Sequence, residues 1–308
     1  MRMKKIKLLV AGVTLMSLLA LTACSLIKGS EGKTVRIATQ NTTESSIVAN
    51  IIAELIEHET DSKATLVSNL GSSSVTHEAL LRGDADIAAT RYTGTDITGA
   101  LGMKAIKDPK KASKTVKREF KKRFDQTWFP TYGFADTYAF MVTKDYAKEN
   151  NLKSISDLSK VADTAKAGVD STWMTREGDG YKEFTETYGF SFKHIYPMQI
   201  GLVYNAVESG KMQSVLGYST DGRIPSYDLT ILNDDKQFFP PYETSMVVNN
   251  DLLRDNPELE QLLHRLDGKI DLETMQKLNH QVDDKLLEPS VVAKKFLEKQ
   301  DYFREEND

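Results

Sequence analysis

From Thr34 onward, the chain alternates short apolar runs with stretches in which apolar residues recur every three or four positions. The run from Thr34 to Thr39 has the length of a strand, and the apolar stripe from Ile47 to Ile56 that follows it is typical of an amphipathic helix. Repeated alternation of this kind predicts an α/β fold, in which helices cover the faces of a sheet.

The same pattern predicts the other elements along the chain. Strands are expected at 64–67, 87–89, 139–142, 166–169, 212–216, 229–232 and 245–248, the last two as a pair. Helices are expected before Gly83 and over 110–123, 257–266, 272–287 and 291–300.

Residues 1–23 have the layout of a secretory signal peptide. Four basic residues precede an apolar stretch over 8–21, which is too short to span a membrane as a helix. Leu21-Thr22-Ala23-Cys24 resembles a bacterial lipobox, whose cysteine is acylated and begins the mature chain. We therefore expect an extracytoplasmic protein, attached to the cell membrane through lipid on Cys24 and a polar linker over 24–33. An ordinary signal peptide with an incidental cysteine is the alternative.

The chain after residue 23 is acidic, with 36 basic and 44 acidic residues and a formal net charge of −8. This balance argues against a nucleic-acid partner and against a membrane held by basic patches. Eight basic residues lie between Lys110 and Arg123. A contact with a partner or a headgroup would fit them, but a solvated helix face explains them more simply.

No motif of enzymatic or metal chemistry stands out. The five histidines lack close ligand spacing, and there is neither a P-loop nor a dinucleotide fingerprint. Gly71-Ser72-Ser73-Ser74 and Gly217-Tyr218-Ser219-Thr220-Asp221 both depart from the nucleophile elbow of hydrolases. We expect a binding protein without metal or cofactor. A lipoprotein hydrolase with a cryptic site and a purely adhesive lipoprotein are the alternatives from other classes.

Four tyrosines lie in polar, turn-like settings at the ends of predicted elements. Tyr92 and Tyr218 each follow a strand that comes after a helix ending at glycine, while Tyr138 and Tyr242 lie near glycine or proline. Ligands of open α/β sheets bind at the carboxyl ends of strands, so two such ends indicate a cleft between two lobes. Any one of these tyrosines is more simply structural. Four electron-rich rings around a dry pocket suit a quaternary ammonium, a cation that donates no hydrogen bonds.

These segments together resemble the substrate-binding lipoproteins of osmoprotectant ABC importers, which take up glycine betaine, carnitine and choline. The resemblance covers essentially the whole mature chain. It rests on Ile37-Ala38-Thr39-Gln40, Asn69-Leu70-Gly71-Ser72-Ser73-Ser74, Arg91-Tyr92-Thr93-Gly94-Thr95, Gly133-Phe134-Ala135-Asp136-Thr137-Tyr138, Gly217-Tyr218-Ser219-Thr220-Asp221-Gly222 and Pro240-Pro241-Tyr242-Glu243.

The resemblance implies a two-lobed periplasmic-binding-protein fold of type II, with hinge-linked lobes and a ligand cleft between them. Lobe I would comprise 34–130 and 228–308, and lobe II would comprise 131–227. The cage implied for the ligand's cation consists of Tyr92, Tyr138, Tyr218 and Tyr242.

The resemblance also implies the groups that hold the ligand's tail. Gln40 matches a glutamine that could donate a hydrogen bond to it, and Thr95 matches a position where family members vary. A neutral hydroxyl at Thr95 should tolerate a carboxylate, whereas Asp96 would penalise one if its side chain faced the pocket. Asp136 is a further candidate for specificity.

We therefore expect a monomeric, membrane-anchored receptor that delivers a quaternary-ammonium osmoprotectant to an ABC permease and is not an enzyme. The alternative within binding proteins is the same fold taking another small zwitterion, such as an amino acid. That site would need a paired arginine and acidic residue for a zwitterion, and Arg91 and Arg223 are the nearest candidates.

Overall fold

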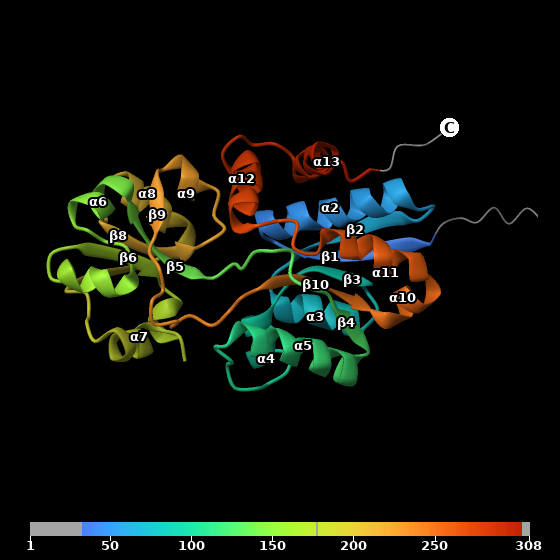
Figure 1. Cartoon of the computed structure of the whole chain (residues 1–308), viewed down its shortest axis with the longest axis horizontal. Helices are drawn as coiled ribbons and strands as arrows, with labels where there is room; N and C mark the ends of the chain where they lie inside the picture. Colours follow the sequence, from blue (N-terminus) through green and yellow to red (C-terminus); the bar gives the residue numbers. More distant parts are fainter. Residues whose placement is uncertain (1–32, 177, 304–308) are drawn as a thin grey trace, which may run out of the picture.

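The computed structural model describes residues 33–176 and 178–303, which form two α/β lobes joined by two crossing segments (Figure 1). The predicted signal peptide over 1–23, the lipid on Cys24 and the linker up to residue 32 lie outside the described residues. Within the described part, no helix combines the length and the apolar character needed to cross a bilayer.

Lobe I is built on a five-stranded sheet of order β2-β1-β3-β10-β4. Its strands are β1 (Thr34–Gln40), β2 (Lys63–Leu70), β3 (Ile87–Tyr92), β4 (Gln126–Trp128) and β10 (Thr244–Asn249). β1 pairs in parallel with β2 and β3, whereas β10 is antiparallel to β3 and β4.

Two groups of helices bury separate apolar clusters against this sheet. One group consists of α2 (Thr43–Glu59), α10 (Asn250–Asp255), α11 (Pro257–Leu263), η3 (His264–Leu266), α12 (Leu272–Asp283) and α13 (Pro289–Lys299). The other consists of α3 (Ser73–Leu81), α4 (Thr93–Thr98) and α5 (Pro109–Phe124). α5 confirms the helix predicted over 110–123. Its apolar side chains Ala112, Val116 and Phe120 are buried, while its lysines are exposed.

Lobe II repeats this plan with a sheet of order β7-β6-β8-β5-β9. Its strands are β5 (Tyr138–Thr143), β6 (Lys166–Asp170), β7 (His194–Met198), β8 (Ser214–Tyr218) and β9 (Leu229–Ile231). Its helices are α6 (Lys144–Glu149), η1 (Ile155–Lys160), η2 (Trp173–Thr175), α7 (Tyr181–Tyr188), α8 (Ile200–Glu208) and α9 (Arg223–Ser226). In each sheet, the fourth strand in the order is antiparallel to the third and follows a crossing segment.

The predicted pairing of the strands near 229–232 and 245–248 is wrong. β9 pairs with β5 in lobe II, whereas β10 lies in lobe I. The predicted boundary after residue 227 is therefore also too early, because Phe238 and Phe239 still pack in the core of lobe II. Consecutive strands often pair, but here a crossing segment separates them.

The two crossing segments run side by side between the lobes. Ala135 and Glu243 form an antiparallel bridge, and the Asp136 N–H donates to the Tyr242 carbonyl at 3.2 Å. This pairing places residues from both crossings next to the ends of β3 and β8.

Helix α12 of lobe I also packs on lobe II (Figure 1). Gln276 Nε2 donates to the Ser219 carbonyl at 2.7 Å, and Asn279 Nδ2 donates to the Thr220 carbonyl at 2.8 Å. Gly222 lies so close to α12 that a Cβ on it would be 2.3 Å from the backbone nitrogen of His280. The lobes are thus joined by side-chain and backbone contacts beside the two crossings.

Candidate ligand-binding site

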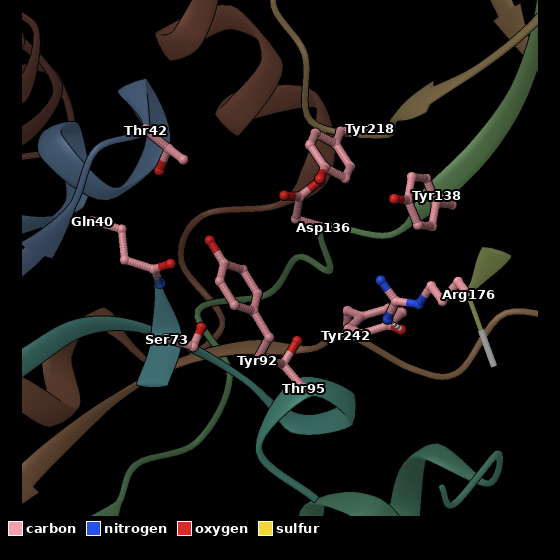
Figure 2. Close-up of a pocket in the computed structure, with 10 residues that line it drawn as sticks. All are labelled: Gln40, Thr42, Ser73, Tyr92, Thr95, Asp136, Tyr138, Arg176, Tyr218 and Tyr242. Carbon is pink, nitrogen blue, oxygen red and sulfur yellow. Dashed lines mark hydrogen bonds between the residues drawn. The ribbon is translucent and has the colours of Figure 1, made fainter. Parts of the chain in front are cut away.

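The four tyrosines selected from the sequence meet in one cavity at the junction of the lobes (Figure 2). The cavity has a volume of about 200 Å³ and lies where β3 and β8 end. Its lining consists of Gln40, Thr42, Ser73, Tyr92, Thr95, Asp136, Tyr138, Arg176, Tyr218 and Tyr242. Seven of the sequence candidates therefore lie together, and Asp96 is not among them.

Tyr138 and Tyr218 form the lobe II side of the cavity as a stacked pair. They lie opposite each other in the β5–β8 ladder, with ring centroids 5.4 Å apart and an interplanar angle of 28°. The Tyr138 hydroxyl donates to Asp170 Oδ2 at 2.6 Å. Burial raises the pKa of Tyr138, and the bond to Asp170 raises it further. The ring therefore stays a neutral phenol with an electron-rich face.

Tyr242 lies on the second crossing segment and contacts both lobes. Its hydroxyl donates to Asp179 Oδ2 at 2.9 Å and accepts from Arg176 Nη2 at 2.7 Å. On the lobe I side, a Cβ at Gly94 would lie 2.8 Å from the Pro241 carbonyl oxygen and 3.0 Å from the Tyr242 ring. Because no side chain fits at position 94, the glycine there allows the Tyr242 ring to pack against the start of α4.

Tyr92 ends β3 and forms the lobe I side. Its hydroxyl donates to Glu44 Oε1 at 3.0 Å, and Glu44 is buried in the first turn of α2. Burial raises the pKa of Tyr92 well above its ordinary value, and the charge of Glu44 raises it further. This tyrosine is therefore also a neutral phenol, held from behind by a carboxyl group.

Arg176 lines the cavity although no sequence pattern selected it. Its Nε donates to Asp179 Oδ1 at 2.6 Å, and its guanidinium carbon is 5.6 Å from the Tyr138 ring centroid and 6.0 Å from that of Tyr242. Burial lowers its pKa, but Tyr242 and Asp179 raise it by more, so the group stays charged. Nη1 has no partner among the described residues and remains available to an anionic group.

Gln40 and Thr95 supply neutral polar groups to the same cavity. Gln40 is the last residue of β1, and its Nε2 donates to the Thr90 carbonyl at 3.3 Å. Thr95 lies in the first turn of α4, directly after Gly94. Because neither side chain is charged, this part of the lining can accept a polar tail without repelling a carboxylate.

Asp136 lines the cavity from the first crossing segment, next to Tyr218 in Figure 2. Burial raises the pKa of its carboxyl to about 7, although the neighbouring Thr220 lowers it. Burial also raises the pKa of Glu44 well above its ordinary value, and the nearby Asp136 raises it further. Two carboxyl groups that resist ionisation therefore lie beside the cavity.

Asp96 does not face the cavity, so its proposed role in ligand preference is not supported. It is buried and paired with Arg91, whose Nε lies 2.8 Å from Asp96 Oδ2. Neighbouring residues of a helix point in different directions, which is why Thr95 lines the cavity and Asp96 does not. Arg223 is likewise paired, with Asp221 at 2.8 Å. Neither arginine considered for an amino-acid site lines the cavity.

Known proteins with similar sequences were found for nearly the whole chain. A family model described as the substrate binding domain of an ABC-type glycine betaine transport system matches residues 33–299. The carnitine transport binding protein OpuCC of Listeria monocytogenes is 54% identical over 306 residues, which cover 99% of each chain. The glycine-betaine-binding protein of Pseudomonas aeruginosa is 30% identical over 282 residues, 87% of this chain and 88% of that protein.

Solved structures agree with the fold. A crystal structure of a glycine betaine/carnitine/choline ABC transporter protein is 54% identical and superposes with a TM-score of 0.85, covering 88% of this chain and all of the other. Apo YehZ of Escherichia coli, at 23% identity, has a TM-score of 0.76 over 87% of this chain and 99% of its own, which supports the fold alone. The predicted two-lobed binding-protein fold is confirmed.

Proposed function

Because the chain belongs to the substrate-binding proteins of ABC-type glycine betaine transport systems, we propose that it captures a quaternary-ammonium osmoprotectant in the four-tyrosine cavity. Members of this family bind a substrate outside the cytoplasm for an ABC importer and catalyse no reaction. The observation that carries the ligand class is the lining itself, in which four neutral tyrosines surround a space of about 200 Å³.

Cation–π attraction accounts for the methylated ammonium. Each ring face contributes ~0.5–2 kcal/mol, depending on how well water is excluded. Four faces then supply a large part of the ~8 kcal/mol that corresponds to micromolar binding. A primary ammonium would need hydrogen-bond acceptors as well, and phenol faces are poor acceptors.

The charges around the cavity favour a zwitterion over a simple cation. Asp136 lies where it can face the ammonium, while Arg176 offers a free guanidinium N–H to a carboxylate. Thr95 adds a neutral hydroxyl. Glycine betaine and carnitine carry both charges, so we propose that they bind more tightly than choline.

The proposal extends to the rest of the receptor's cycle. Tyr92 comes from lobe I and Tyr138 and Tyr218 from lobe II, so a ligand that contacts all of them favours the closed arrangement of the lobes. Lipid on Cys24 would keep the monomer at the membrane, where it delivers the ligand to an ABC permease.

Calorimetric titration of the purified protein with glycine betaine, carnitine, choline and glycine tests the proposal. We expect micromolar binding of the methylated ligands, with choline the weakest of the three, and no binding of glycine. Binding of glycine as strong as that of glycine betaine would favour the amino-acid alternative. Silence from all three methylated ligands would mean that the four rings serve only the structure.

A further inference from the structure

A second cavity adjoins the ligand cavity on its acidic side. It has a volume of about 410 Å³ and shares Thr42, Asp136 and Tyr218 with the first. Its full lining consists of Asn41, Thr42, Thr43, Glu44, Asp136, Tyr218, Thr220, Asp221, Arg223, Asn279 and Asp283. Four of these residues are acidic and one is basic. A single arginine cannot neutralise four carboxylates, so the others need hydrogen-bond donors or protons.

Two of the four carboxyl groups have partners. Asp221 is bound by Arg223, with oxygen–nitrogen distances of 2.8 and 2.9 Å. Asp283 on α12 accepts a hydrogen bond of 2.5 Å from the Thr43 hydroxyl. Arg223, the single arginine of this cavity, is therefore bound to Asp221 and does not neutralise the other carboxyl groups.

The other two carboxyl groups are incompletely bound. Tyr92 donates to Glu44 Oε1, and Thr220 lies beside both groups and favours their charged forms. Glu44 Oε2 and Asp136 Oδ1 are nevertheless buried without a hydrogen-bond partner among the described residues. A buried carboxylate oxygen without a donor is costly, and two such groups close together cannot both ionise cheaply. A proton on one of them would turn an acceptor into a donor.

The surroundings of the pair add no compensating positive charge of their own. Tyr92 of β3, Tyr218 of β8 and Tyr204 of α8 face it as neutral phenols. Asp221 adds a negative charge from the turn before α9. Asp283 of α12 also lines the second cavity, but its neighbours there are Thr43, Asp221, Arg223 and His280. Arg223 lines the second cavity but is paired with Asp221, and Arg176, which lines the first cavity, is paired with Asp179.

We propose that Glu44 and Asp136 act as one specificity-determining carboxyl pair, which holds a shared proton without ligand and releases it to solvent when a quaternary ammonium binds beside Asp136. The inference rests on the proposed function. One fixed positive charge enters beside Asp136 and one proton leaves the pair, so the charge at this end of the cavity is unchanged; the carboxylate of a zwitterion lies instead toward Arg176. A neutral ligand of the same shape cannot displace the proton, and the pair therefore selects for permanent cations.

The sign of the pH dependence follows from this exchange. Below neutral pH the pair holds its proton, and a ligand has to expel it; above neutral pH the site is already ionised. Affinity should therefore rise with pH between 6 and 8, by at most about tenfold per unit for one linked proton. Glycine betaine itself keeps the same charges throughout this range.

The test is calorimetric titration of the full chain with glycine betaine at pH 7 in phosphate and in Tris. These buffers differ in their heat of protonation, so the difference between the two binding heats gives the number of protons released. We expect a release of about half a proton or more, and binding at least threefold weaker at pH 6 than at pH 8.

Variants assign the effect to the pair. Asp136→Asn should abolish the release and flatten the pH profile, and Glu44→Gln should reduce the release at pH 7 because Asp136 loses its like-charged neighbour. Asp283→Asn removes a carboxyl from the same second cavity and should leave the release unchanged. If the wild-type protein binds glycine betaine with the same heat in both buffers, the proposed proton release is wrong and the proposed tyrosine cage is unaffected. If it does not bind glycine betaine at all, both proposals are wrong.

Discussion

The two sides of the ligand cavity hold their tyrosines by different means. On the lobe I side, Tyr92 is bonded to the buried Glu44, and the adjoining helix is secured by the buried pair Arg91–Asp96. On the lobe II side, Tyr138 is likewise bonded to the buried Asp170, but Tyr218, which stacks on Tyr138, is 40% exposed and has no such support. The lobe I side is therefore set by buried polar contacts before a ligand arrives. On the lobe II side, the partly exposed ring of Tyr218 still has surface that a ligand can bury.

The largest effect on the free energy of unfolding is expected from breaking the buried ion pair Arg91–Asp96 of lobe I. Asp96→Ala would leave the guanidinium of Arg91 buried without its partner, and arginine cannot shed its charge. Removing one partner of a buried pair costs about 3–5 kcal/mol of unfolding free energy. Denaturant unfolding of the variant measures this loss.

An exposed ion pair provides the control for that experiment. Glu273→Ala breaks its contact with Lys277 on the surface of α12 and should cost no more than about 1 kcal/mol. Equal losses in the two variants would show that the Arg91–Asp96 pair does not support lobe I.

The next largest effect concerns the rings themselves. Tyr92→Ala and Tyr138→Ala should each weaken the binding of glycine betaine by about tenfold or more, since each removes a ring face worth up to ~2 kcal/mol. Tyr138→Ala should cost more, because Tyr218 loses the ring on which it stacks. Titration calorimetry measures both, and wild-type affinity in either variant would exclude the cage.

Arg176→Met separates the two charges of a zwitterionic ligand. A hydrogen bond to a charged group contributes about 1.5–3 kcal/mol, so glycine betaine should lose about tenfold more affinity than choline, which has no carboxylate. Arg254→Met removes the same charge from an exposed site on α10 and should affect neither ligand. An equal loss for choline and glycine betaine would mean that Arg176 acts only through Tyr242.

The last comparison concerns the hydroxyls of the two strand-end tyrosines, and the smallest effect is expected at Tyr218. Tyr92→Phe removes the donor to Glu44 Oε1 and leaves a buried acceptor, which should cost about 1–3 kcal/mol of stability. Tyr218→Phe, at a partly exposed ring, should stay within about 0.5 kcal/mol of wild type. Denaturant midpoints that shift equally in both variants would contradict the difference between the two sides.

The sequence predicts the tyrosine cluster because its signal is local. Tyr92 and Tyr218 each follow an apolar run, and strands in this fold bring such ends to one crevice. Tyr138 and Tyr242 lie beside the turns that became the crossing segments. Periodicity and turn residues select these four tyrosines, and the resemblance to the osmoprotectant-binding family implies that they form one cage.

Arg176 and Glu44 escape sequence reasoning for physical reasons. Arg176 follows a short 3₁₀ turn after β6, in a polar stretch without periodicity. Glu44 is in the first turn of a helix, where a carboxylate normally complements the helix dipole in solvent. Its burial depends on Tyr92 and Thr220, which are far away in the sequence. The boundary of lobe II depends on β9 in the same way, since its partner β5 comes long before it.

Gly222 has a mechanical consequence. A side chain at this position would collide with the backbone of α12, so at this point the lobes touch without clearance. A rigid body that turns about its closest contact moves least there and most at the opposite rim. We expect lobe II to rotate about the contact between Gly222 and α12, so that a small rotation there gives a wide opening at the mouth of the cleft.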